Sequence, residues 1–188
     1  ARAFTLNSGT FNANNFNVTT GRFSSTNSNT RAITMGSGTW TLTGNNVTIW
    51  NTGTVTGLTT TRGNPILCNY SGSTGTRQIS AGNSSEANTP DISITAGTDI
   101  VLISVAGVHD LDFTGFSGTL TNASFDIYGS LTISTGMTVG AGTNLVQFRA
   151  SSGTQNITSN GKILDFPITF NAAAGTTFKL LDNTTVGV

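Results

Sequence analysis

The segment from Gly118 to Val188 decides the fold, and it reads GTLTNASFDIYGSLTISTGMTVGAGTNLVQFRASSGTQNITSNGKILDFPITFNAAAGTTFKLLDNTTVGV. Along it, a Gly-Thr step followed by a short strand of alternating apolar and polar residues recurs. Gly-Thr steps begin at Gly53, Gly75, Gly97, Gly118, Gly153 and Gly175, and most of them are roughly 22 residues apart. This repetition indicates that one structural unit is repeated along the chain.

Apolar residues alternate with Thr, Ser and Asn through most of the sequence, as in the pairs Ile92/Ile94 and Leu131/Ile133. In a strand, such alternation places the apolar side chains on one, buried face and the polar side chains on the other, solvent-exposed face. No window has the three-and-four spacing of apolar residues that predicts an amphipathic helix. Residues Ile100–Val105 form a continuous apolar run, which predicts a strand covered on both faces.

A repeat of this length, with two or three short strands and Gly or Asn corners, predicts an all-β fold: a parallel β-helix, or solenoid, with coils of roughly 22 residues. An antiparallel β-sandwich is the alternative, because it also contains many short alternating strands. Asn160-Gly161 is the one two-residue hairpin signal between apolar runs, which favours the solenoid.

We expect residues 1–188 to form a single β-solenoid domain, a segment of a longer chain or assembly. The repeat is weakest at residues 59–91, where Pro65 and Pro90 interrupt the strands. This part predicts a less regular insertion, either a long corner or a lateral loop that offers a binding surface.

The composition excludes several classes of function. Charged residues make up 9% of the 188 residues, and eight basic side chains balance eight acidic ones. A nucleic-acid-binding protein would need a cationic surface, so no nucleic-acid partner is expected. No apolar run approaches the ~18 residues of a membrane helix, so no membrane insertion is expected either. The single cysteine, Cys68, shares strand parity with Ile66 and is predicted to lie in the core.

Four phrases resemble the Thr/Gly/Asn-rich β-helical repeats of bacteriophage virion proteins of the tail-fibre, tailspike or appendage type: Gly9–Thr19, Met35–Gly44, Asp110–Leu120 and Ile157–Phe170. Low-complexity β-helices of bacterial adhesins share this composition. The resemblance covers nearly the whole chain and implies a structural or host-contacting role outside the cell or on the virion surface, for example as a homotrimer. It carries over no catalytic residue.

Candidate chemistry is sparse, and we expect no enzyme activity, no cofactor and no dedicated metal site. Asp110 and Asp112 share a strand face and point outward, so with the aromatic residues Trp50 and Tyr128 they are weak candidates for contact with a cell-surface glycan. Acid and base roles in glycoside cleavage, or calcium binding, remain alternatives for the two aspartates. His109 is the only histidine and is predicted to lie at a surface or corner.

These observations predict a structural, non-catalytic β-solenoid of an extracellular fibre or virion appendage, with a role in assembly or attachment. The alternative is a polysaccharide-binding or polysaccharide-cleaving β-helix. Self-association is the expected partnership, because a solenoid ends in unpaired strand edges.

Overall fold

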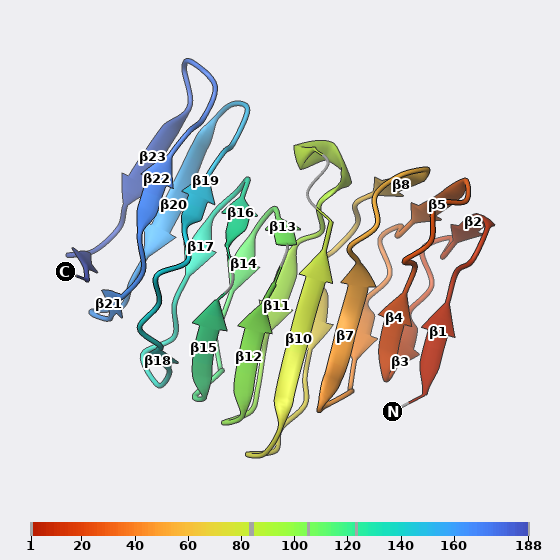
Figure 1. Cartoon of the computed structure of the whole chain (residues 1–188), viewed down its shortest axis with the longest axis horizontal. Helices are drawn as coiled ribbons and strands as arrows, with labels where there is room; N and C mark the ends of the chain where they lie inside the picture. The colour runs from red at the N-terminus through yellow and green to blue at the C-terminus, as the bar shows by residue number, and fades with distance from the viewer. Residues whose placement is uncertain (1, 83–84, 105, 123, 188) are drawn as a thin grey trace.

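The computed structural model describes residues 2–82, 85–104, 106–122 and 124–187. The chain forms a parallel β-solenoid of about 8 turns, and the two termini lie at opposite ends of its long axis (Figure 1). Every strand pairing between described residues is parallel. The predicted solenoid is confirmed, and the antiparallel sandwich is excluded.

The strands form three faces, and most coils contribute one strand to each of them. The first face is a seven-stranded sheet, made in spatial order by β1 (Ala3–Thr5), β4 (Arg22–Ser24), β7 (Val47–Thr52), β10 (Thr76–Ala81), β12 (Ile100–Ile103), β15 (Thr119–Asn122) and β18 (Thr138–Val139). Two further short strands pair with each other beyond β18, namely β21 (Ile163–Leu164) and β24 (Thr185–Val186).

The second face is an eight-stranded sheet that runs the length of the solenoid. It contains β3 (Val18–Thr20), β6 (Trp40–Leu42), β9 (Ile66–Cys68), β11 (Ile92–Ile94), β14 (Leu111–Asp112), β17 (Leu131–Thr132), β20 (Thr154–Thr158) and β23 (Thr177–Leu180).

The third face is divided into two sheets. One contains β2 (Gly9–Asn12), β5 (Arg31–Thr34) and β8 (Leu58–Thr61), and the other contains β13 (Ala106–Val108), β16 (Phe125–Ile127), β19 (Val146–Phe148) and β22 (Ile168–Phe170). Between them the chain forms a short 3-10 helix, η1 (Glu86–Asn88). The side-chain oxygen of Asn88 accepts a hydrogen bond from the Thr60 N–H of β8 (3.1 Å), which links η1 to that sheet.

The core is a set of ladders of equivalent residues. On the second face, paired positions stack in the order Trp40, Ile66, Ile92, Leu111, Leu131 and Ile157, all of them buried. Each burial of such a side chain contributes about 1.5–3 kcal/mol, and every rung is covered by the coils on both sides. Cys68 and Ile133 are also fully buried, as the alternation predicted, and burial raises the pKa of the Cys68 thiol to about 12.

The corners absorb differences in coil length. Paired residues are 22 positions apart from Val18 to Trp40, 30 apart from Val47 to Arg77, and 19 apart from Thr119 to Thr138. Gly75, Gly97, Gly153 and Gly175, all starts of Gly-Thr steps, have φ between 78° and 103°, a region that favours glycine. These steps therefore mark corners of the solenoid.

Residues 59–91 hold β9, β10 and η1, and both strands continue the stack. The irregular part of this segment lies around η1, where a turn of 3-10 helix takes the place of a strand of the third face. The segment in which the sequence repeat is weakest is therefore also the segment in which the third face is divided into two sheets.

One local prediction is wrong, and the one hairpin-type signal has a different role. β12 alternates between buried and more exposed residues, and Ile100 is 42% exposed, so the outer face of this strand is not covered; Val105, at the end of the apolar run, lies outside the described residues. Asn160 and Gly161 do have positive φ (50° and 74°), but they connect β20 to β21 in a different sheet. That turn is a solenoid corner and not a hairpin.

Two arginines lie fully inside the protein near corners, which the sequence pattern did not indicate. The Arg77 guanidinium donates to both carboxylate oxygens of Asp99 (2.9 and 2.7 Å) and to the Cys68 carbonyl. The Arg31 guanidinium instead donates to backbone carbonyls, including those of Ser25 and Thr56. Buried charge is tolerated here because its hydrogen bonds are satisfied.

Candidate functional site

A charged corner lies where the third face passes into the second face beside η1. Asp91, Asp110 and Ser130 each stand one residue before the paired strand positions Ile92, Leu111 and Leu131. The three residues consequently stack at the same corner of successive coils. The Asp110 N–H donates to Asp91 Oδ1 (3.0 Å), and the Ser130 N–H donates to Asp110 Oδ1 (2.7 Å).

His109 lies among three carboxylates at this corner. Its Nδ1 is 2.7 Å from Asp91 Oδ1 and 3.5 Å from Asp110 Oδ1, and its Nε2 is 3.7 Å from Glu86 Oε1. The side chains of His109, Asp91 and Glu86 are between 17% and 20% exposed, and that of Asp110 is 49% exposed. The group is therefore largely fixed by the protein and still open to solvent.

The electrostatics of the corner centre on Asp91. Burial alone would raise the pKa of its carboxyl, but the hydrogen bonds with His109 and the Asp110 N–H, together with the charges of His109 and Arg62, hold that pKa below its ordinary value. Asp91 is therefore a carboxylate near neutral pH. The Nη1 atom of Arg62 is buried and has no hydrogen-bond partner among the described residues.

The sequence predicted part of this site. Asp110 belongs to the corner, whereas Asp112 does not: Asp112 Oδ1 accepts hydrogen bonds from the Thr114 N–H (2.8 Å) and hydroxyl (2.6 Å) in a tight turn. His109 does lie at a corner, but in contact with acidic groups that were not anticipated. Asp91 and Glu86 were missed, although Asp91-Ile92 and Asp110-Leu111 repeat the same Asp-apolar phrase one coil apart.

Trp50 must be removed from the glycan-contact candidates, because it is fully buried and stacks on Phe23 (centroids 4.6 Å apart). The cause is a register shift between β7 and β10: Gln78 pairs with Thr48, but Ile79 pairs with Trp50. Ile49 is left unpaired in this bulge, and both Ile49 and Trp50 are buried. A bulge interrupts the alternation of faces. The strict alternation assumed from the sequence therefore placed the Trp50 side chain on the outer face, whereas it points into the core.

Tyr128 is also poorly placed for a ligand from solvent, since only 6% of it is exposed. Arg149 covers its ring, with the guanidinium carbon 5.9 Å from the centroid, and pairs with Asp126 at 2.7 Å. Burial raises the pKa of the Tyr128 hydroxyl, and the charge of Asp126 adds to that increase. Tyr128 therefore packs within the wall of the solenoid.

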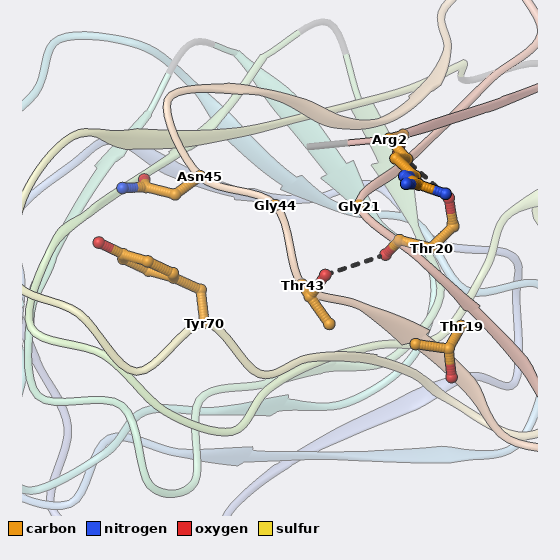
Figure 2. A pocket seen from close by; sticks show the side chains of 8 residues that line it. All are labelled: Arg2, Thr19, Thr20, Gly21, Thr43, Gly44, Asn45 and Tyr70. Atoms are coloured by element: carbon orange, nitrogen blue, oxygen red, sulfur yellow. Dashed lines mark hydrogen bonds between the residues drawn. The ribbon is translucent and has the colours of Figure 1, made fainter.

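A second candidate is a shallow groove of about 530 Å³ along the corner between the second and first faces in the first three coils. Figure 2 shows Tyr70 and Asn45 on one side of it, Arg2 and Thr20 on the other, and Thr43 between them. The Thr43 hydroxyl donates to the Thr20 carbonyl (3.4 Å), which ties neighbouring coils together. Hydroxyl, amide, guanidinium and aromatic groups thus line one open surface.

Comparison with protein-family profiles, curated proteins and solved structures gave no match. The resemblance to phage appendage repeats accordingly has no support from known relatives. Among the described residues, no helix has both the length and the apolar character needed to cross a membrane.

Proposed function

We propose that this chain is a structural, non-catalytic β-solenoid that assembles end to end, as part of an extracellular fibre or a virion appendage. The observation that carries the proposal is the apolar surface at the C-terminal end of the stack. The described residues exposed there to between 46% and 54% are Ile163, Phe170, Leu180, Leu181 and Val186.

Three of them, Phe170, Leu180 and Val186, line a hollow of about 220 Å³ together with Ile157, Leu164, Ile168 and Thr184. The hollow opens onto the interior of the last described coils. Contiguous apolar surface on a soluble protein commonly marks a contact site. Covering it would extend the core ladders that stabilise the rest of the molecule.

The opposite end of a second copy is the occupant that fits best. Each face has an edge strand at both ends: β23 and β3 on the second face, and β22 and β2 on the third. Because all pairings are parallel, the N-terminal edge of one copy presents strands in the direction that the C-terminal edge of another can continue. Such a contact is heterologous and can repeat into a filament.

The charge and composition agree with this role. Formal net charge is zero and charged residues are scarce, so little long-range repulsion opposes association. The outer surface is polar chiefly through hydroxyl and amide groups, and the repeats resemble those of phage appendages. These features favour a fibre or virion setting outside the cell.

Light scattering with size-exclusion chromatography tests the proposal. We expect the wild-type mass to rise above 19.3 kDa with concentration, and the double variant Phe170→Ser/Leu180→Ser to remain a monomer with unchanged circular dichroism. Ile100→Ser is the matched control, because Ile100 is exposed to a similar degree in the middle of the first face. A wild-type monomer at all concentrations, or association lost only in Ile100→Ser, would contradict end-to-end assembly.

Glycan binding is the second candidate, and the groove around Tyr70 favours it. Sugar-binding surfaces combine an aromatic ring with a few well-placed polar groups, and Tyr70, Asn45 and Arg2 supply both. On a glycan array, Tyr70→Ala should lose binding while Asp110→Asn/Asp112→Asn retains it. The reverse pattern would place binding at the two aspartates, and an array without signal for the wild type would remove this candidate.

A further inference from the structure

The charged corner around His109 is explained neither by end-to-end assembly nor by the groove around Tyr70. We propose that Asp91, His109 and Asp110 bind a divalent transition-metal ion of the Zn²⁺ type. Each residue offers one ligand atom, and these atoms all lie within 4.8 Å of one another. The site joins two successive coils, since Asp91 precedes β11 whereas His109 and Asp110 precede β14.

The spacing of the ligand atoms suits such an ion. Zn²⁺ bonds to imidazole nitrogen and carboxylate oxygen at about 2.0–2.2 Å, so ligands around it stand about 3–3.5 Å apart. His109 Nδ1 lies 2.7 Å from Asp91 Oδ1 and 3.5 Å from Asp110 Oδ1. Small side-chain rotations bring these atoms around one ion. The ion would replace the proton shared between Nδ1 and Asp91, and that proton would leave to solvent.

The surroundings hold the ligands in place, as metal sites require. A metal-bound histidine commonly donates its other ring N–H to a carboxylate, and here the Glu86 carboxylate lies 3.7 Å from His109 Nε2. Glu86 is itself fixed from a distant coil, because its Oε2 accepts a hydrogen bond from the Ser151 N–H (2.8 Å). The Asp91 and Asp110 carboxylates each accept a backbone N–H. Backbone hydrogen bonds therefore pre-orient the two aspartates, and His109 lies between them and Glu86.

The charge of the corner and its access to solvent also favour a bound metal ion. Three carboxylates meet at this corner, with Arg62 near Asp91 as a compensating cation. A divalent ion would offset the excess negative charge. Nitrogen with oxygen ligands favours Zn²⁺, Co²⁺ or Ni²⁺ over Ca²⁺, which takes six to eight oxygens. The half-exposed Asp110 side chain leaves a path for entry.

The competing explanation is an ion-pair cluster in which a protonated His109 neutralises the carboxylates without any metal. The two explanations differ in one respect that can be measured directly. An ion-pair cluster has no specific affinity for Zn²⁺, whereas a metal site requires the His109 nitrogen. The matched substitution is His109→Gln, which keeps a polar side chain of comparable length and removes the imidazole.

The test is isothermal titration of untagged, chelator-treated protein with Zn²⁺, accompanied by the visible absorption spectrum of the Co²⁺ form. We expect one saturable site, at least about 100-fold weaker binding in His109→Gln, and about 10- to 100-fold weaker binding in Glu86→Gln. Asp112→Asn is the control and should bind as the wild type does. Should His109→Gln fail to fold by circular dichroism, Asp91→Asn replaces it with the same expectation.

Absence of saturable Zn²⁺ binding by the wild type would overturn the proposal in favour of the ion-pair cluster. Unchanged affinity in His109→Gln would do the same, because the ion would then sit elsewhere. Tighter binding of Ca²⁺ than of Zn²⁺ would also overturn it, since the ligand set would not include the imidazole.

Discussion

The two ends of the solenoid contain the same kind of core and differ in how well it is covered. In the first three coils, Phe23, Trp40 and Trp50 are fully buried and pack ring against ring. In the last two coils, Phe148 is buried, but Phe170, which stacks on it at 5.2 Å, is 54% exposed.

Cover from a neighbouring coil causes this difference. Phe4 and Phe11 pack edge to face (4.7 Å) at the N-terminal end, and Phe4 also packs against Phe23, so the first coil closes over the rings below it. At the C-terminal end, Phe170 and Phe178 pack against Phe148 and against each other, and no further ring packs on them among the described residues. In a stacked fold each unit is stabilised by its neighbours, so a group of exposed apolar side chains remains at the C-terminal end.

The largest effect is expected in the middle of the stack, where both neighbours are present. Ile133→Asp places an unpaired carboxylate in a fully buried position and should abolish cooperative folding, because a buried charge without a partner costs many kcal/mol. Thermal unfolding followed by circular dichroism measures it. Thr135→Asp, at an exposed position two residues away, is the control and should melt like the wild type.

A paired substitution compares the two ends directly. Trp40→Ala, in the covered cluster, should lower the free energy of unfolding by about 3–5 kcal/mol. Phe170→Ala, in the uncovered cluster, should lower it by about 1 kcal/mol or less at protein concentrations that keep the chain monomeric. Denaturant unfolding provides both values. Equal losses at the two sites would show that Phe170 is already covered within a single chain.

A smaller effect depends on pH and concerns the contact between the last two coils. The Ser159 N–H, above all, and also the Ser159 hydroxyl, the Asn160 N–H and the Thr184 hydroxyl donate to Asp182, and together they lower the pKa of its carboxyl. Its stabilising contribution is therefore complete above the ordinary pKa of 3.8 and is lost as pH falls through the lower pKa of the folded state.

Asp182→Asn should accordingly melt slightly below the wild type at about pH 6, and the difference should vanish near about pH 2. Melting curves of the two proteins across this range measure the effect. A difference that grows on acidification would mean that the Asp182 carboxyl is protonated in the folded protein.

Sequence reasoning reached the fold because two signals agree: alternation by two placed Ile66, Cys68 and Ile133 in the core, and the Gly-Thr steps marked corners. It failed at Trp50 because a bulge shifts the alternation by one residue, and nothing in the local pattern indicates it. The cluster at His109 depends on which residues stack, and coil lengths vary too widely for that register to be counted from the sequence. The ion pair between Arg77 and Asp99 depends on the same stacking register, so it could not be predicted from the sequence either.

Amide hydrogen exchange at increasing protein concentration tests the central claim most directly, namely that the uncovered end of one chain receives another. Exchange at the edge strands β22 and β23, and at β2 and β3 of the opposite end, should slow by at least about 10-fold as concentration rises. Exchange in the central strand β14 should not change. Exchange rates that are independent of concentration in all of these strands would contradict end-to-end assembly.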